Sequence, residues 1–152
     1  MGGFGGWAIT KDCFDYIRKI LPEGKIILEF GSGWGTGELA KHYKMYSIEH
    51  NEGYIGGRDS TYIHAPIKDG WYDYDIVKNN LPETYDLIFV DGPTGRIGRD
   101  GFYKHLDLFD TSVPIIIDDV HRDAEKALIE KVSKKLNKEY KILPDKATGV
   151  IL

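Results

Sequence analysis

The 152-residue sequence predicts an α/β fold with a doubly wound sheet, mostly parallel, to which a C-terminal hairpin adds an antiparallel strand. Three observations favour this fold. Helical and extended patterns alternate along the chain, which is typical of a parallel sheet with helices on both faces. The run Tyr85–Asp91 is almost wholly apolar, as expected of a central parallel strand. Residues 139–143 and 147–152 flank Pro144-Asp145-Lys146, which predicts the hairpin.

The N-terminal half is expected to begin with a helix over Thr10–Leu21. Thr10 can cap this helix, and Phe14, Ile17 and Leu21 recur on one face. The elements that follow are a strand over 25–30, a helix beginning near Thr36, a strand over 45–49, a short or irregular helix over 52–57 and a strand over 61–65.

The C-terminal half continues the alternation. It is expected to hold an aromatic and acidic loop over 71–75, the central strand over 85–91, a helix over 102–109 and a fifth strand over 114–118. A long helix is predicted over Asp123–Asn137 because its apolar residues recur at helical spacing. The two hairpin strands then complete the sheet.

Length and composition suit one globular domain, which we place at residues 10–152 behind a Gly-rich arm at residues 1–9. The net charge of −4 gives no general attraction to nucleic acid or to anionic membranes, so neither is expected as a partner. The first residues lack the basic and apolar regions of a secretion signal, and no apolar run is long enough to span a bilayer. We therefore expect a cytoplasmic protein.

A glycine-rich loop follows the first predicted strand, with the sequence Glu29-Phe30-Gly31-Ser32-Gly33-Trp34-Gly35-Thr36. Glycines let such a loop turn sharply and let its backbone approach a ligand closely. The helix after the loop adds free N–H groups. Glu49 ends the second predicted strand, where nucleotide-binding folds place an acid that holds a ribose diol. These features predict a site for a nucleotide-like cofactor.

These residues resemble the class I S-adenosylmethionine-dependent methyltransferases, which have a Rossmann-like doubly wound sheet. The loop Glu29–Thr36 is similar to their first motif, E/D-x-G-x-G-x-G. Glu49 matches the acid after their second strand, and Tyr85–Pro93 matches their fourth-strand motif. The terminal hairpin matches their sixth and seventh strands. The resemblance covers residues 10–152 and implies the class I methyltransferase fold with S-adenosylmethionine as cofactor.

The resemblance also implies the cofactor contacts. Glu29 and the glycine loop would face the methionine part, and Glu49 would accept hydrogen bonds from the ribose hydroxyls. Either His50 or Asn51 would line the ribose and adenine side, the segment 64–67 would border adenine, and Asp91 would lie near the sulfonium or the methionine amine. The residues assigned to the cofactor are Glu29, Gly31, Ser32, Gly33, Gly35, Thr36, Glu49, His50, His64, Ala65 and Asp91.

A second group of candidates follows the fourth and fifth predicted strands. Asp91 closes one strand, and Asp118 and Asp119 close the other, with His121 just beyond them. Because adjacent parallel strands end at one edge of a sheet, these side chains are expected to converge. Their like charges must then be neutralised by a shared proton, a bound cation or a nearby arginine.

The three carboxylates are also similar to those of metal-dependent O-methyltransferases of the catechol and macrolide-sugar type. Those enzymes place one Asp after the fourth strand and an acidic pair after the fifth. The resemblance implies that Asp91, Asp118 and Asp119 bind Mg²⁺ or another divalent cation, for which oxygen ligands are suited. The alternative is that Asp118 caps the following helix or binds an arginine.

Catalysis is expected to use His121, Asp91 and Asp119. The ordinary pKa of histidine, about 6.5, suits a base that takes a proton from a hydroxyl at neutral pH. A histidine that only hydrogen-bonds Asp119 at the start of the helix is the alternative. The methyl transfer itself depends mainly on orientation of the two reactants.

Acceptor contacts are predicted from Arg96, Arg99, Arg122 and Tyr72. Arginines can hold a carboxylate or phosphate with paired N–H donors, although loop arginines are as often simply solvated. Tyr72 belongs to the aromatic segment 71–75, and aromatic faces suit sugars and cations. The arginine-bearing loops are similar to those of small methyltransferase-like domains that modify sugars or polysaccharides.

The predicted function is therefore S-adenosylmethionine-dependent methyl transfer to an oxygen of a polar small molecule or sugar. An NAD-type oxidoreductase is the alternative enzyme, and a non-catalytic cofactor-binding subunit is the alternative outside catalysis. The chain has almost no insertion to bind a substrate. A second copy in a homo-oligomer, or another partner, is therefore a way to complete its acceptor pocket.

Overall fold

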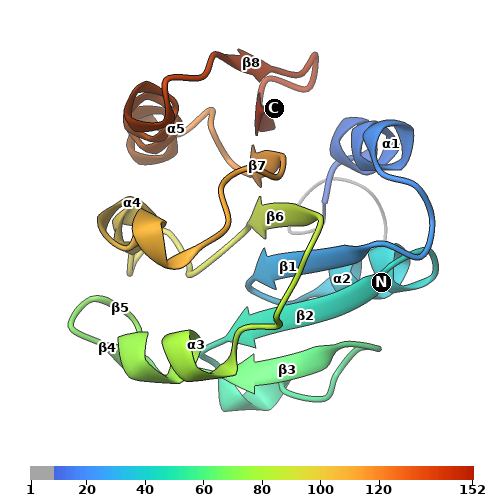
Figure 1. Ribbon diagram of the computed structural model, residues 1–152, viewed down its shortest axis with the longest axis vertical. Coiled ribbons are helices and arrows are strands. Elements are labelled where there is room, and N and C mark those ends of the chain that lie inside the picture. Colours follow the sequence, from blue (N-terminus) through green and yellow to red (C-terminus); the bar gives the residue numbers. More distant parts are fainter. Residues whose placement is uncertain (1–8) are drawn as a thin grey trace.

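The computed structural model describes residues 9–152, so residues 1–8 of the predicted arm lie outside the described part. A seven-stranded sheet has the order β3-β2-β1-β6-β7-β9-β8 (Figure 1). The five strands from β3 to β7 in this order are parallel, whereas β9 is antiparallel to both of its neighbours. The predicted fold class is thereby confirmed. The strands are β1 (Ile26–Phe30), β2 (Lys44–Glu49), β3 (Thr61–His64), β6 (Leu87–Val90), β7 (Ile115–Ile117), β8 (Tyr140–Ile142) and β9 (Gly149–Ile151).

Helices cover both faces of the sheet (Figure 1). On one face, Ile17 of α1 and Leu39 of α2 share a buried cluster with Phe89 of β6. On the other face, Val77 of α3 joins the buried cluster that contains Ile88 of β6. Neighbouring strand residues thus point to opposite faces, and the central strand is buried on both. The helices are α1 (Lys11–Ile20), α2 (Trp34–Ala40), α3 (Tyr74–Asn80), α4 (Asp100–Lys104) and α5 (Asp123–Leu136).

Helix α1 agrees with the predicted helix. The Thr10 hydroxyl accepts a hydrogen bond from the Cys13 N–H (3.0 Å) and donates one to Asp145 (2.6 Å). Asp145 also accepts hydrogen bonds from Ala147 N–H and Thr148 N–H in the hairpin turn (2.9 Å each). One aspartate therefore joins the start of the first helix to the C-terminal hairpin.

The segment 71–75 is not the loop that the sequence predicts. Trp71–Tyr72 forms strand β5, which pairs antiparallel with β4 (Ile67–Lys68). The turn between them holds Asp69 and Gly70, both with positive φ. Asp73 then caps helix α3, because its Oδ1 accepts hydrogen bonds from the N–H groups of residues 75 and 76. Local capping and turn chemistry thus replace the loop with ordered structure.

The helix predicted over 102–109 is also corrected. Helix α4 begins at Asp100 and ends at Lys104, and a 3₁₀ helix follows over Leu106–Leu108. Phe102 and Leu106 are nonetheless buried, so the apolar spacing persists through the break. The short helix expected over 52–57 is a 3₁₀ helix over Glu52–Tyr54.

None of the helices in residues 9–152 combines the length and the apolar character needed to cross a membrane.

Candidate functional site

The candidate site lies where the parallel strands end, at the edge to which the arrowheads of β1, β2 and β6 point in Figure 1. Register fixes which residues are neighbours there. Phe30 of β1 pairs with Ile48 of β2 on one side and with Val90 of β6 on the other. The residues just beyond these pairs are Gly31, Glu49 and Asp91, which therefore lie along one edge.

The glycine loop turns at Gly31, which has φ +91°. A Cβ at this position would lie 2.8 Å from the Asp91 carbonyl oxygen, so a larger residue would push the two strand ends apart. The loop leads into α2, where the Thr36 hydroxyl accepts a hydrogen bond from the Gly33 N–H (3.0 Å). The close packing explains the glycine at residue 31. That the loop, including Ser32 and Gly35, binds a cofactor stays a prediction.

Glu29 lies beneath the loop instead of facing the crevice. Its side chain is buried, and its Oε2 accepts hydrogen bonds from the hydroxyls of Thr36 (2.6 Å) and Ser47 (2.5 Å). Burial raises the pKa of Glu29 to about 7, although the hydrogen bonds from the two hydroxyls lower it. Its carboxylate is used inside the fold, where it holds α2 to β2, and its contact with a cofactor stays a prediction.

Glu49 joins the tips of the first two strands. Its Oε1 accepts a hydrogen bond from the Ser32 N–H (2.9 Å), and its Oε2 accepts one from the Asn51 N–H (2.8 Å). His50 Nδ1 lies 3.4 Å from Oε2. A carboxylate has about four acceptor positions, so Glu49 retains capacity for further donors such as a diol. Its geometry is compatible with the predicted ribose contact.

The predicted adenine side continues from Glu49 to the end of β3. His64 pairs with Glu49 across β2 and β3, and the Ala65 N–H donates to the Glu49 carbonyl oxygen (3.0 Å). His64 is exposed, whereas Ala65 is fully buried. The three residues are therefore brought together, as the sequence predicts, and their contact with adenine stays a prediction.

The acidic residues after β6 and β7 also converge. Asp91, Asp118 and Asp119 each offer a carboxylate oxygen, and the three oxygens lie within 4.8 Å of one another. Asp119 has φ +67°, an uncommon conformation, and its N–H donates to Asp118 Oδ1 (2.8 Å). Burial raises the pKa of Asp91 well above its usual range, and the charge of Asp118 raises it further. Burial likewise raises the pKa of Asp118.

Arg99 lies against this acidic cluster, with only 4% of its side chain exposed. Its Nη2 is 3.1 Å from Asp119 Oδ2 and 3.9 Å from Asp91 Oδ1. Its Nε donates to the Pro93 carbonyl oxygen and its Nη1 to the Asp118 carbonyl oxygen, both at 3.0 Å. Arg99 is therefore a buried partner of the predicted metal ligands, and the acceptor contact expected of it stays a prediction.

The other predicted residues lie at the margin of the cluster. Arg122 Nη2 is 3.6 Å from Asp119 Oδ1, with 41% of its side chain exposed. Arg96 and His121 are exposed. Within residues 9–152, no hydrogen bond or ion pair joins His121 to the carboxylates. The structure thus brings Arg122 to the cluster and leaves Arg96 and His121 in solvent.

By ligand chemistry alone, three carboxylates suit a hard divalent cation. Their arrangement here does not, because the Arg99 guanidinium already lies beside two of them and has little access to solvent. A divalent cation bound to Asp119 would lie against this positive charge. The predicted Mg²⁺ site therefore does not fit the residues as they are arranged.

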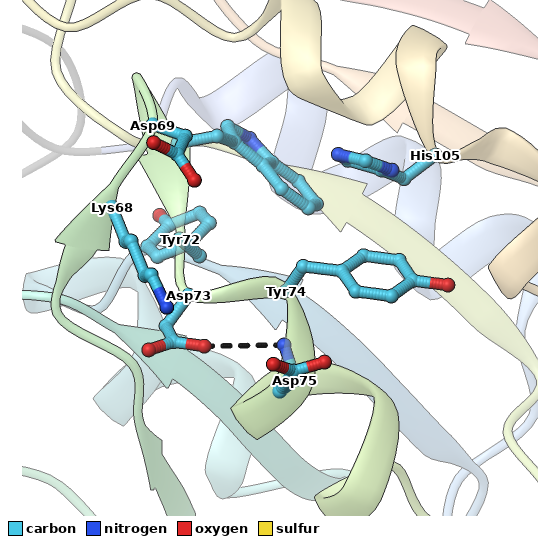
Figure 2. Close-up of a pocket in the computed structure, with 8 residues that line it drawn as sticks. Lys68, Asp69, Tyr72, Asp73, Tyr74, Asp75 and His105 are labelled. Atoms are coloured by element: carbon cyan, nitrogen blue, oxygen red, sulfur yellow. Dashed lines mark hydrogen bonds between the residues drawn. The ribbon is translucent and has the colours of Figure 1, made fainter.

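An aromatic hollow of about 320 Å³ lies beside the strand ends, between the β4–β5 hairpin, the start of α3 and His105. Figure 2 shows Tyr74 and His105 near each other, with ring centroids 4.7 Å apart. Asp69 and Lys68 contribute charge to its wall. The sequence interpretation missed His105, since only the tertiary packing of the end of α4 brings it to this hollow.

Tyr72 lines the same hollow but is almost completely buried, with 1% of its surface exposed. Its hydroxyl has no hydrogen-bond partner among the described residues, as is also true of the Trp71 indole N–H. A Cβ on Gly92 would lie 2.5 Å from the Tyr72 hydroxyl, so the phenol reaches under the turn that follows Asp91. Tyr72 therefore connects the hollow to the acidic edge, and its contact with an acceptor stays a prediction.

Several solved structures that are similar to this chain in fold are methyltransferases. A methyltransferase from Pyrococcus furiosus matches with a TM-score of 0.60 and 15% identity, over 91% of this chain and 78% of that one. The tRNA methyltransferase TrmK of B. subtilis matches with a TM-score of 0.56 and 13% identity, over 93% and 64% of the two chains. The MycE methyltransferase of the mycinamycin pathway, in complex with Mg and SAH, matches with a TM-score of 0.55 and 14% identity, over 90% and 43%. The fold is that of the class I methyltransferases.

No protein-family model and no curated protein sequence matches the chain. The class I methyltransferase fold agrees with the resemblance stated from sequence. The similar structures differ in what they act on, since one is a tRNA methyltransferase and another belongs to the mycinamycin pathway. The acceptor of this chain, and the expectation that it is not nucleic acid, therefore do not follow from the class I methyltransferase fold.

Proposed function

We propose that the chain is an S-adenosylmethionine-dependent methyltransferase that modifies a hydroxyl oxygen of a polar small molecule or sugar. The observation that carries this proposal is the bond from the Ser32 N–H to the Glu49 carboxylate. It joins the glycine loop to Glu49 at adjacent strand tips, which supports a role for Glu49 in holding a ribose diol, inside a fold shared with methyltransferases. In the alternative, NAD-type interpretation, the same edge would bind a dinucleotide, and no further feature of the site favours it.

S-adenosylmethionine supplies an activated methyl group, so the protein has to orient an acceptor and receive its proton. Glu49 and the Gly31 loop support the cofactor side of the crevice. Asp91 has 34% of its side chain accessible and a raised pKa, which makes it a stronger base than an ordinary aspartate once it is ionised. His121 is exposed and makes no hydrogen bond or ion pair with the cluster among residues 9–152. We therefore favour Asp91 as the group that receives the hydroxyl proton.

The aromatic hollow supports a sugar or similar polar acceptor. Aromatic faces pack against the C–H faces of sugars, and carboxylates such as Asp69 accept hydrogen bonds from hydroxyl groups. A nucleic acid acceptor has less support, because a protein that binds phosphates usually offers a basic surface and this chain has a net charge of −4. Transfer of a labelled methyl group to RNA but to no sugar would show that the acceptor is RNA and not a sugar.

Calorimetry with S-adenosylhomocysteine tests the cofactor. The wild-type protein is expected to bind it, and Glu49→Gln is expected to bind about tenfold more weakly or worse, because an amide offers one acceptor oxygen instead of two. Glu52→Gln is the matched control, since Glu52 is exposed on the adjoining 3₁₀ helix. Binding of NADH without binding of S-adenosylhomocysteine would support the oxidoreductase instead.

A further inference from the structure

The acidic cluster at the ends of β6 and β7 brings three carboxyl groups close together. Asp91, Asp118 and Asp119 each offer a carboxylate oxygen, and these three oxygens lie within 4.8 Å of one another. A single cation could contact all three. Like charges this close repel one another, and burial strengthens the repulsion. The cation that the fold provides should therefore be sought among the residues around the cluster.

Arg99 supplies positive charge to this cluster from inside the protein. Its guanidinium is planar and remains charged at every physiological pH, which suits it for a buried ion pair. One nitrogen, Nη2, is shared between Asp119 Oδ2 (3.1 Å) and Asp91 Oδ1 (3.9 Å). It thus lies between the same carboxylates that a metal ion would have to join.

The guanidinium is also fixed in place. Its Nε donates to the Pro93 carbonyl oxygen after β6, and its Nη1 donates to the Asp118 carbonyl oxygen after β7, each at 3.0 Å. The side chain is only 4% exposed, and moving it away would leave these two carbonyl oxygens without their hydrogen-bond donors. Arg122 adds a second positive charge 3.6 Å from Asp119 Oδ1. The two oxygens of Asp119 thus each face an arginine.

We propose that Arg99 is the resident cation of the acidic cluster and occupies the place of a divalent metal, so that its removal opens a divalent-cation site. The cluster then serves as a rigid joint between the ends of β6 and β7, built around Arg99 as a positioning residue. The wild-type protein binds no divalent cation through Asp119.

The test measures Mn²⁺ binding that depends on Asp119. Binding is followed by electron paramagnetic resonance of free Mn²⁺, and each protein is compared with the same protein carrying Asp119→Asn. The wild-type protein and its Asp119→Asn variant are expected to bind Mn²⁺ equally. Arg99→Met removes the charge and keeps an unbranched side chain, and it is expected to gain a site that binds Mn²⁺ about tenfold or more tightly than the wild type.

Two further variants separate the charge of Arg99 from its packing. Arg99→Lys keeps a positive charge and is expected to gain no site, whereas a merely structural role would make it resemble Arg99→Met. Arg96→Met removes an exposed arginine of the same loop and is expected to behave as the wild type. If Arg99→Met does not fold, Arg99→Gln is the second neutral variant, and circular dichroism establishes that each protein is folded.

Two results would overturn the proposal. One is Mn²⁺ binding by the wild type that Asp119→Asn removes, which would mean that Arg99 moves aside for a metal. The other is a folded neutral variant that gains no Asp119-dependent binding. The titration uses neither S-adenosylmethionine nor an acceptor, so its outcome is independent of whether the chain proves to be a methyltransferase.

Discussion

At the scale of single residues, buried charges at the strand ends are bound by groups of the protein itself. Glu29 is held by two hydroxyls beneath the glycine loop, and Arg99 is held by two carbonyls and by Asp119. A buried charge without such partners would be costly. These residues therefore shape the site by holding backbone segments together.

The pH dependence of stability tests the position of Glu29. Its pKa is about 7 in the folded protein and about 4.5 in an unfolded chain, so the folded state holds the proton more tightly. The stabilisation of the folded protein by protonated Glu29 is complete below pH 4.5 and is lost as the pH rises through about 7. Glu29→Gln cannot ionise, so its free energy of unfolding relative to the wild type is expected to rise by up to about 3 kcal/mol between pH 5 and pH 8.

Urea denaturation at the two pH values measures this effect of Glu29→Gln. Glu52→Gln is the control, because Glu52 is exposed and its replacement should change stability equally at both pH values. A Glu29→Gln difference no larger than that of the control would show that Glu29 does not ionise within this pH range.

The residue scale also shows what one sequence can predict about the site. The meeting of Asp91, Asp118 and Asp119 follows from strand ends that share an edge, so it is predictable. The role of Arg99 is less so, because an arginine in a glycine-rich loop gives no sign of burial until the loop is folded. His105 is missed for a similar reason, since its position depends on how α4 packs.

At the scale of elements, helix α3 and the β4–β5 hairpin build most of the aromatic hollow. The hairpin places Asp69 at its turn, and α3 begins with Tyr74. Val77 is the buried residue of α3. A seven-residue helix with so little apolar surface has a weak helical pattern, which is why the sequence interpretation took its start for a loop. Helix α1, with a capping threonine and a clear apolar stripe, was predictable.

The cap of α3 provides a test at this scale. Asp73 Oδ1 accepts hydrogen bonds from the N–H groups of Asp75 (3.1 Å) and Ile76 (3.3 Å). Asp73→Ala is expected to lower the free energy of unfolding by about 1 kcal/mol, because these N–H groups lose their partner. Asp73→Ser keeps a capping oxygen and is expected to restore most of the loss. Equal losses for the two variants in urea denaturation would show that the cap does not hold α3.

At the scale of the whole molecule, the sheet order decides where chemistry can occur. Five parallel strands bring their carboxyl ends to one edge, and the antiparallel β9 closes the other side of β7. The sequence predicts the mostly parallel sheet and its antiparallel strand, because the strands alternate with helices and end in a hairpin. The acceptor is not predictable in the same way, since similar folds at 13–15% identity include a tRNA methyltransferase and a mycinamycin pathway enzyme.

Hydrogen exchange with and without S-adenosylhomocysteine tests the proposed cofactor site, because it locates the ligand as well as detecting it. We expect the ligand to slow backbone exchange over residues 31–36 and 49–52, where the glycine loop and Glu49 meet. Slowed exchange confined to the aromatic hollow around residues 68–75, or none at any saturating concentration, would contradict it.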